Sequence, residues 1–118
     1  MERSETLFAA SGGVGVLTLN RPEIRNALTG QQILDEVIAT VEAADVAEDV
    51  TVLVITGQGS AFSAGGNVKD MDSGSGLFAG DVGTIAEGYR RTIQRLTSTM
   101  AATDLVTIAA VNGPAIGA

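Results

Sequence analysis

The chain has 118 residues, enough for one hydrophobic core, and its 7 basic and 14 acidic residues leave a net charge of −7. The absence of cysteine and histidine excludes disulfides, thiolate metal ligands and a Ser–His nucleophile pair, and we predict no metal site. The negative charge and the few aromatic residues argue against nucleic-acid binding. No apolar run reaches about 18 residues and the N-terminus lacks a signal-peptide core, so we expect a cytoplasmic protein that does not associate with membranes.

The first third of the chain predicts a β-hairpin followed by a helix. Residues 7–10 and 14–19 are apolar runs separated by a serine and two glycines, which favour a tight turn, and Pro22 ends the second run. A helix is predicted over residues 30–45 with Thr29 as its N-cap. Its apolar face repeats at three- and four-residue spacing and comprises Ile33, Val37, Ile38, Val41 and Ala44.

The rest of the chain predicts a second strand–helix–strand series. Residues 50–56 (VTVLVIT) form a β-branched run that is typical of a strand buried on both faces. A glycine-rich loop is predicted over residues 72–83, then one amphipathic helix over residues 85–102, then another buried strand over residues 105–111. This order indicates a single α/β domain.

Two segments carry the chemistry: residues 61–71 (AFSAGGNVKDM) and residues 107–118 (TIAAVNGPAIGA). Each passes from strand-like sequence into small residues that could open a helix, which would aim unpaired backbone N–H groups at a common point. Two N–H groups from separate segments are what an oxyanion hole requires. The first segment alone could equally be a tight turn without a ligand, and the second alone is weaker evidence because such turns are common. It is the pair that favours a site.

The pair resembles the two oxyanion motifs of the enoyl-CoA hydratase/isomerase (crotonase) superfamily. Asn20-Arg21-Pro22 with Asn26-Ala27-Leu28 is similar to the opening signature of that family, and all three motifs stand in the family's order. The resemblance implies a crotonase-like α/β spiral of ββα units. It also implies that residues 1–118 are the N-terminal part of one such domain, truncated after the second oxyanion motif.

The same resemblance implies the site residues. The backbone N–H groups of Gly66 and Ala118, with Gly117 as the alternative to Ala118, would hold the thioester carbonyl of an acyl-CoA and stabilise its enolate. Coenzyme A would enter as part of the substrate, with no separate cofactor. Its adenine and pantetheine would run between two sets of residues: Arg25 and Ala27 on one side, and Ala64, Gly66, Asn67, Val68 and Lys69 on the other. From the residues alone, Arg25 could equally be a solvated loop charge.

The reaction stays open among several members of the superfamily. Addition of water to a 2-enoyl-CoA in fatty acid metabolism, by a homotrimer or hexamer, is the first expectation. Isomerisation or other crotonase chemistry is the alternative, because the two glutamates of hydratases fall beyond Ala118 in the family pattern. A non-catalytic CoA-binding or assembly subunit is a further alternative. The remaining carboxylates are expected to be solvent-exposed: Asp70, Asp72, Asp81 and Glu87. A basic stripe on the following helix is expected to face solvent or another subunit, with contact to a CoA phosphate as the alternative: Arg90, Arg91 and Arg95.

Overall fold

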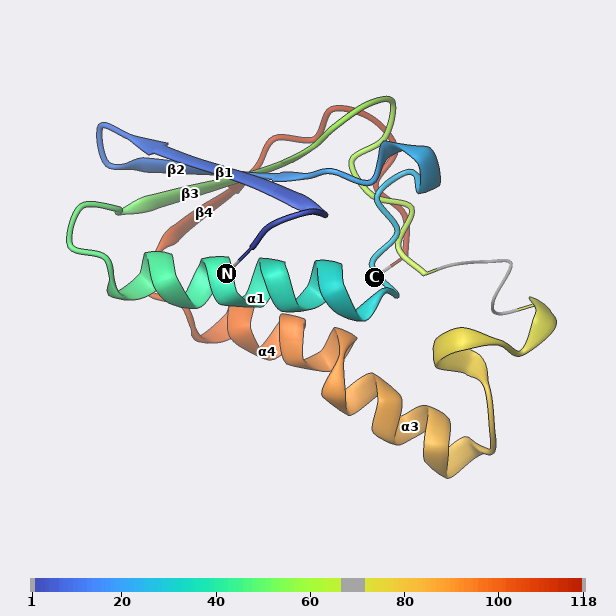
Figure 1. Cartoon of the computed structure of the whole chain (residues 1–118). Helices are drawn as coiled ribbons and strands as arrows, with labels where there is room; N and C mark the ends of the chain where they lie inside the picture. The colour runs from blue at the N-terminus through green and yellow to red at the C-terminus, as the bar shows by residue number, and fades with distance from the viewer. Residues whose placement is uncertain (1, 67–71, 118) are drawn as a thin grey trace.

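In residues 2–66 and 72–117, which this computed structural model describes, a four-stranded sheet carries its helices on one face (Figure 1). The sheet order is β1-β2-β3-β4, with β1 antiparallel to β2 and the other two pairings parallel. The strands are β1 (Thr6–Ser11), β2 (Val14–Leu19), β3 (Val52–Gly57) and β4 (Val106–Ala109). The helices are α1 (Gln31–Val46), α3 (Val82–Arg91) and α4 (Ile93–Ala102), with short 3-10 turns η1 (Pro22–Ile24) and η2 (Gly76–Phe78).

The predicted hairpin is confirmed. Ser11 pairs with Val14, so Gly12 and Gly13 form a two-residue turn, and their φ angles of 60° and 84° lie in the left-handed region. A type I′ turn needs positive φ at both central positions, and glycine adopts it without a steric penalty.

The core lies between α1 and the sheet. Ile33, Val37 and Val41 of α1 pack in one cluster with Leu17 of β2 and Leu53 of β3. The predicted apolar face of the helix is therefore confirmed, Ile38 and Ala44 also being buried. The predicted cap is wrong: Gly30 precedes the first turn and no side chain caps it. Tertiary burial of the apolar face, at about 1.5–3 kcal/mol per large side chain, can secure the helix without that cap.

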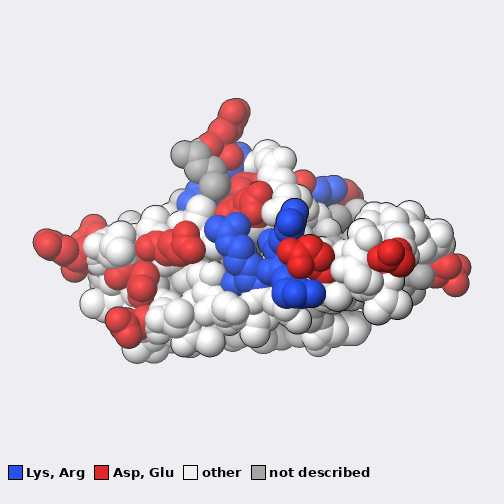
Figure 2. Space-filling model, turned by 90° about the horizontal axis from the view of Figure 1, so that it is seen from below, with Lys and Arg blue, Asp and Glu red and all other residues white. Residues whose placement is uncertain are grey.

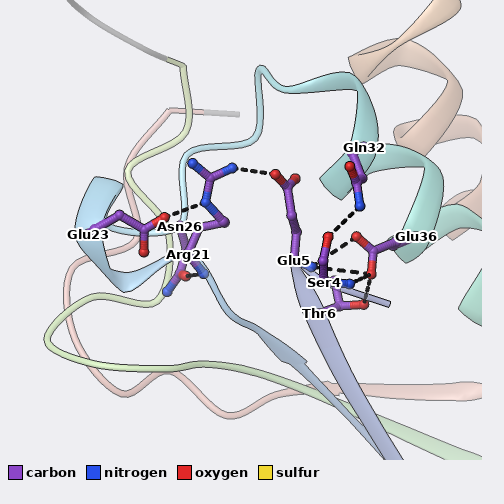
Figure 3. A network of polar contacts seen from close by, with 8 residues as sticks. All are labelled: Ser4, Glu5, Thr6, Arg21, Glu23, Asn26, Gln32 and Glu36. Atoms are coloured by element: carbon purple, nitrogen blue, oxygen red, sulfur yellow. Dashed lines mark hydrogen bonds and ion pairs between the residues drawn. The ribbon is translucent and has the colours of Figure 1, made fainter. Parts of the chain in front are cut away.

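A polar network attaches the start of the chain to α1 (Figure 3). The Glu36 carboxylate is 1% exposed and accepts hydrogen bonds from the backbone N–H groups of Ser4 and Glu5, both at 3.0 Å, and from the Thr6 hydroxyl at 3.2 Å. Nearby, Arg21 pairs with both Glu5 and Glu23. The hydrogen bond from Arg21 lowers the pKa of Glu23, and the same bond raises the pKa of Arg21.

The single helix predicted over residues 85–102 is instead two helices. Thr92 interrupts it with φ −118° and ψ −97°, and its hydroxyl donates a 2.6 Å hydrogen bond to the Gly88 carbonyl. A threonine hydroxyl that bonds back to the preceding turn competes with the helical ladder and favours a bend. α4 packs against α1, whereas α3 extends away from the sheet (Figure 1). Apolar spacing continued through Thr92, so periodicity gave no sign of the break.

The two parallel strands share a sheet as predicted, but they are not buried on both faces. Leu53 is the one fully buried residue of β3, and every residue of β4 is exposed. The strand register puts Val14, Val16, Val106 and Ile108 on the face opposite α1, where they are 37%, 37%, 60% and 48% exposed. Among the described residues, no helix covers this far face. The β-branched residues of β3 and β4 indicated burial on both faces, but the described residues cover only the face toward α1.

Candidate functional site

Three loops meet at one edge of the sheet. They comprise residues 20–28, 58–66 and 110–117, which follow β2, β3 and β4 in turn. Because these strands are parallel, their carboxyl ends lie at the same edge, which is the usual place for a ligand in an open α/β sheet (Figure 1).

The first loop is organised by Asn26, which is fully buried. Its φ is 57° and that of Arg25 is 52°, a left-handed conformation that asparagine tolerates better than most residues. The Asn26 Oδ1 accepts from the Arg21 N–H at 2.8 Å, and its Nδ2 donates to the carbonyls of Gln58 and Ala61, both at 3.1 Å. Its side chain therefore joins the first loop to the second.

Backbone and hydroxyl hydrogen bonds then hold these two loops together. The Ala64 N–H donates to the Arg25 carbonyl and the Leu28 N–H donates to the Gly65 carbonyl, both at 2.8 Å. The buried Ser63 hydroxyl donates to the Asn26 carbonyl at 2.8 Å and accepts from the Gly65 N–H at 3.1 Å. The path of the chain into Gly66 is consequently determined by directional bonds.

The third loop lies along the second as a short parallel extension of the sheet. Ser63 and Ala115 form an isolated parallel bridge. The Pro114 carbonyl accepts from the N–H groups of Phe62 and Ser63 at 3.0 and 3.2 Å, and the Ile116 N–H donates to the Ser63 carbonyl at 3.0 Å. The expectation that residues 115–118 begin a helix is therefore wrong for the described part, because Ala115 and Ile116 pair with Ser63.

The small residues of the two motifs come face to face. A Cβ atom added at Gly117 would lie 3.6 Å from the Gly65 Cα and 3.7 Å from the Gly66 N. Gly113 is closer still, because a Cβ there would be 2.2 Å from the Ser60 carbonyl oxygen. Within residues 2–66 and 72–117, neither the Gly66 N–H nor the Gly117 N–H has a hydrogen-bond acceptor. Gly117 of the third loop therefore lies close to the Gly66 nitrogen of the second.

The predicted site residues fall into two groups. Arg25, Ala27, Ala64, Gly66 and Gly117 are brought together by the bonds between the loops, with Ala27 buried and the Arg25 side chain exposed. Asn67, Val68, Lys69 and Ala118 lie outside the described residues, as does Asp70. We did not predict from the sequence that the Ser63 hydroxyl joins the first two loops. A hydroxyl among small apolar residues was the feature that could have indicated it.

The other charged residues predicted to face solvent do so. Figure 2 shows basic side chains gathered beside acidic ones on the face formed by the helices, where Arg90 and Arg91 pair with Glu87, and Arg95 pairs with Asp35. Asp81 caps α3 by accepting from the Thr84 N–H at 2.8 Å, and this bond lowers the Asp81 pKa. In the described part of the chain, no three His, Asp or Glu residues cluster as metal ligands. No described helix is long and apolar enough to cross a membrane.

The sheet edge of this α/β protein is thus lined by backbone N–H groups and glycines, and among the described residues no group of three carboxylates gathers there as metal ligands. The family model described as enoyl-CoA hydratase/isomerase matches residues 9–118. The chain belongs to the enoyl-CoA hydratase/isomerase family.

Individual relatives agree with this assignment. A probable enoyl-CoA hydratase of Mycobacterium bovis is 36% identical over 104 residues, which cover 88% of this chain and 37% of the relative. Enoyl-CoA delta isomerase 2 of Rattus norvegicus is 30% identical over 118 residues, which cover 98% of this chain and 28% of the relative. The chain therefore spans about a third of the length of these relatives.

Solved structures show the same fold. An enoyl-CoA hydratase/isomerase from Mycobacterium paratuberculosis matches with a TM-score of 0.77 and 30% identity, covering 98% of this chain and 44% of that one. A Legionella pneumophila protein assigned to the enoyl-CoA hydratase/isomerases (crotonases) matches with a TM-score of 0.80 and 28% identity, covering 95% and 41%. The predicted crotonase-like α/β fold is confirmed.

Proposed function

We propose that this chain binds acyl-CoA thioesters and forms the N-terminal, oxyanion-hole part of an enoyl-CoA hydratase. The thioester carbonyl accepts hydrogen bonds from the Gly66 N–H and from a second N–H of the third loop, that of Ala118 or alternatively Gly117. As water adds to the conjugated double bond, negative charge develops on this oxygen, and fixed amide dipoles stabilise it.

The observation that supports this proposal is the approach of Gly117 to Gly66. A Cβ at Gly117 would lie 3.7 Å from the Gly66 N, and neither amide has an acceptor within the described residues. A larger residue at position 117 would fill the space beside the first donor. Ala64 and Gly66 are small and only half-buried, so a flat thioester can lie against the backbone there.

Coenzyme A is proposed as part of the substrate, with no separate cofactor. Arg25 and Ala27 would line one side of its path, and Ala64, Asn67, Val68 and Lys69 the other. Arg25 is proposed to meet a phosphate of CoA, since its side chain is exposed while its backbone is held to the second loop by the bond from the Ala64 N–H. We further propose a cytoplasmic protein that assembles as a homotrimer or hexamer.

Isomerisation is the second candidate reaction, and it is favoured by the match to a relative named as an isomerase. Both reactions use the same oxyanion hole and differ in the acid and base groups that move protons. A CoA-binding subunit without catalysis would also keep the two donors. Turnover of a 2-enoyl-CoA and of a 3-enoyl-CoA by the protein distinguishes the three.

Ligand binding and two matched substitutions test the proposal. Crotonyl-CoA should raise the unfolding temperature, since a ligand at 100 times its Kd stabilises the native state by about 2.7 kcal/mol. Gly66→Pro removes the N–H and should lower kcat about 100- to 1000-fold with a smaller change in CoA affinity. Gly66→Ala keeps the N–H donor and is the control. Alanine fits this position because the φ of Gly66 is not positive, unlike those of Gly65 and Gly117.

The readouts separate binding from chemistry. Hydration is followed by loss of absorbance from the conjugated thioester, and affinity by titration calorimetry with CoA and with crotonyl-CoA. An unfolding temperature that is unaffected by crotonyl-CoA would contradict acyl-CoA binding. A folded Gly66→Pro protein with the kcat of Gly66→Ala would show that Gly66 is not an oxyanion donor.

A further inference from the structure

Two asparagines from different loops hold the same backbone oxygen. The Ala61 carbonyl accepts from the Asn26 Nδ2 at 3.1 Å and from the Asn112 Nδ2 at 3.3 Å. Ala61 lies in the second loop, Asn26 in the first and Asn112 in the third. One oxygen therefore connects the segments that follow β2, β3 and β4.

Each asparagine also uses its remaining hydrogen-bonding capacity on these segments. Asn112 accepts from the Gly57 N–H at 3.0 Å and donates to the Gly59 carbonyl at 3.1 Å. Asn26 accepts from the Arg21 N–H at 2.8 Å and donates to the Gln58 carbonyl at 3.1 Å. Both side chains act as donor and acceptor together, because a carboxamide carries an N–H₂ donor beside a carbonyl acceptor.

The position of Ala61 is transmitted to the proposed oxyanion donors over a short, bonded path. Two residues after Ala61, Ser63 bonds to the Asn26 carbonyl through its hydroxyl and to Ile116 through its carbonyl. The Gly65 N–H then bonds back to the Ser63 hydroxyl. A shift of the Ala61 carbonyl therefore moves Gly66 on one side and Gly117 on the other.

We propose that Asn26 and Asn112 are paired positioning residues, which set the relative placement of the Gly66 amide and of Gly117, the alternative second donor, by sharing the Ala61 carbonyl. This inference rests on the proposed function, because placement matters only where both donors must meet one oxygen. The two asparagines act through the backbone: the Asn26 side chain is fully buried and each Asn112 bond is to this chain. Preorganised donors contribute to catalysis only while their geometry is held.

The first test uses the free protein and Asn112→Asp. Aspartate has the same size and keeps an acceptor for the Gly57 N–H, but it loses both donated bonds and places a charged oxygen against the Gly59 and Ala61 carbonyls. Gln58→Glu is the matched control, because it makes the same change of charge next to Gly59, which Asn112 contacts. The Gln58 side chain is exposed and makes no hydrogen bond among the described residues.

We expect Asn112→Asp to shift the amide NMR signals of Gly66 and Gly117 and to speed hydrogen exchange at the Ile116 N–H by about tenfold or more, as a lost net hydrogen bond implies. Gln58→Glu should leave these signals and rates at wild-type values. If Asn112→Asp does not fold, Asn112→Ala takes its place, since the side chain is at the surface. Unchanged Gly66 and Gly117 signals in the folded variant would overturn the positioning role, whether or not the protein binds acyl-CoA.

The second test reports on the donors in the complex. The carbonyl stretching frequency of bound crotonyl-CoA labelled with ¹³C at the thioester falls when both donors engage it. Asn112→Asp should return most of this shift toward the solution frequency while the Kd for CoA stays within about twofold, a split that general destabilisation does not produce. A wild-type frequency in the variant contradicts positioning, whereas no binding by the wild-type protein contradicts the proposed function instead.

Discussion

The region between α1 and the sheet and the three loops at the sheet edge are held by different forces. Leu17, Ile33 and Leu53 are buried against one another by apolar packing, which is non-directional and tolerates small shifts. Asn26, Ser63 and Asn112 join the loops by hydrogen bonds whose geometry is narrow. Apolar packing therefore stabilises the fold, whereas directional hydrogen bonds position the backbone amides to which we attribute function.

The largest effect should come from truncating the packed region. Leu53→Ala removes a side chain that is 0% exposed and should lower the free energy of unfolding by about 2–5 kcal/mol. Val54→Ala, the next residue on the far face, is the control and should cost about 1 kcal/mol, because its side chain is partly in water already. Urea denaturation measures both. Equal losses would mean that the two faces of β3 do not differ in burial as described.

A smaller loss is expected from the loops. Ser63→Ala removes the hydroxyl that bonds Asn26 and Gly65 and should cost about 1–3 kcal/mol, since it leaves buried polar groups unpaired. Ser60→Ala, at an exposed position in the same loop, should change stability by less than about 0.5 kcal/mol. Denaturation in the same urea series gives both values. A Ser63→Ala loss no larger than that of Ser60→Ala would contradict the described bonding.

The smallest effect should be a pH dependence outside both regions. The Thr103 hydroxyl at 2.7 Å and the Asp104 N–H at 2.9 Å bond the Asp45 carboxylate and lower its pKa in the folded state. A depressed folded pKa stabilises the native state above the unfolded pKa of about 3.9 and loses that contribution as pH falls through the folded value.

In Asp45→Asn the unfolding temperature should therefore decrease less between about pH 5 and pH 3 than in the wild type. This range extends about one unit either side of the ordinary aspartate pKa. Thermal unfolding across the range measures the difference. Asp49→Asn is the control, since Asp49 has an exposed side chain in the following turn. An acid-induced loss of stability that is as steep in Asp45→Asn as in the wild type would show that this carboxylate does not contribute.

Local pattern was enough to predict most of the packed region. The spacing of Ile33, Val37 and Val41 predicted the buried face of α1, and the glycine pair predicted the hairpin. These features depend on neighbours in sequence. The break at Thr92 accompanies a hydroxyl that bonds to the preceding turn, and the exposure of β4 depends on which elements are present to cover it, so apolar periodicity could predict neither.

The loops were predicted only through the family resemblance. Small residues after two strands indicated that backbone would be accessible, but the pairing of Ser63 with Ala115 joins segments whose contact no local pattern encodes. The prediction of a helix after Pro114 was wrong for the same reason, because Ala115 pairs with the distant Ser63 and does not begin a helical turn. Asn26 and Asn112 were visible in the motifs, yet their common acceptor became evident only in three dimensions.

The hydrogen bonds of Asn112 join residues that are far apart in sequence, which has a consequence for the order of folding. Its bond to the Gly57 N–H spans 55 residues, whereas the hairpin closes over a two-residue turn. Closing a long loop costs more entropy and is slower than closing a short one, so contacts distant in sequence form late. We therefore expect Gly66 and Gly117 to come together near the end of folding, after the hairpin has formed.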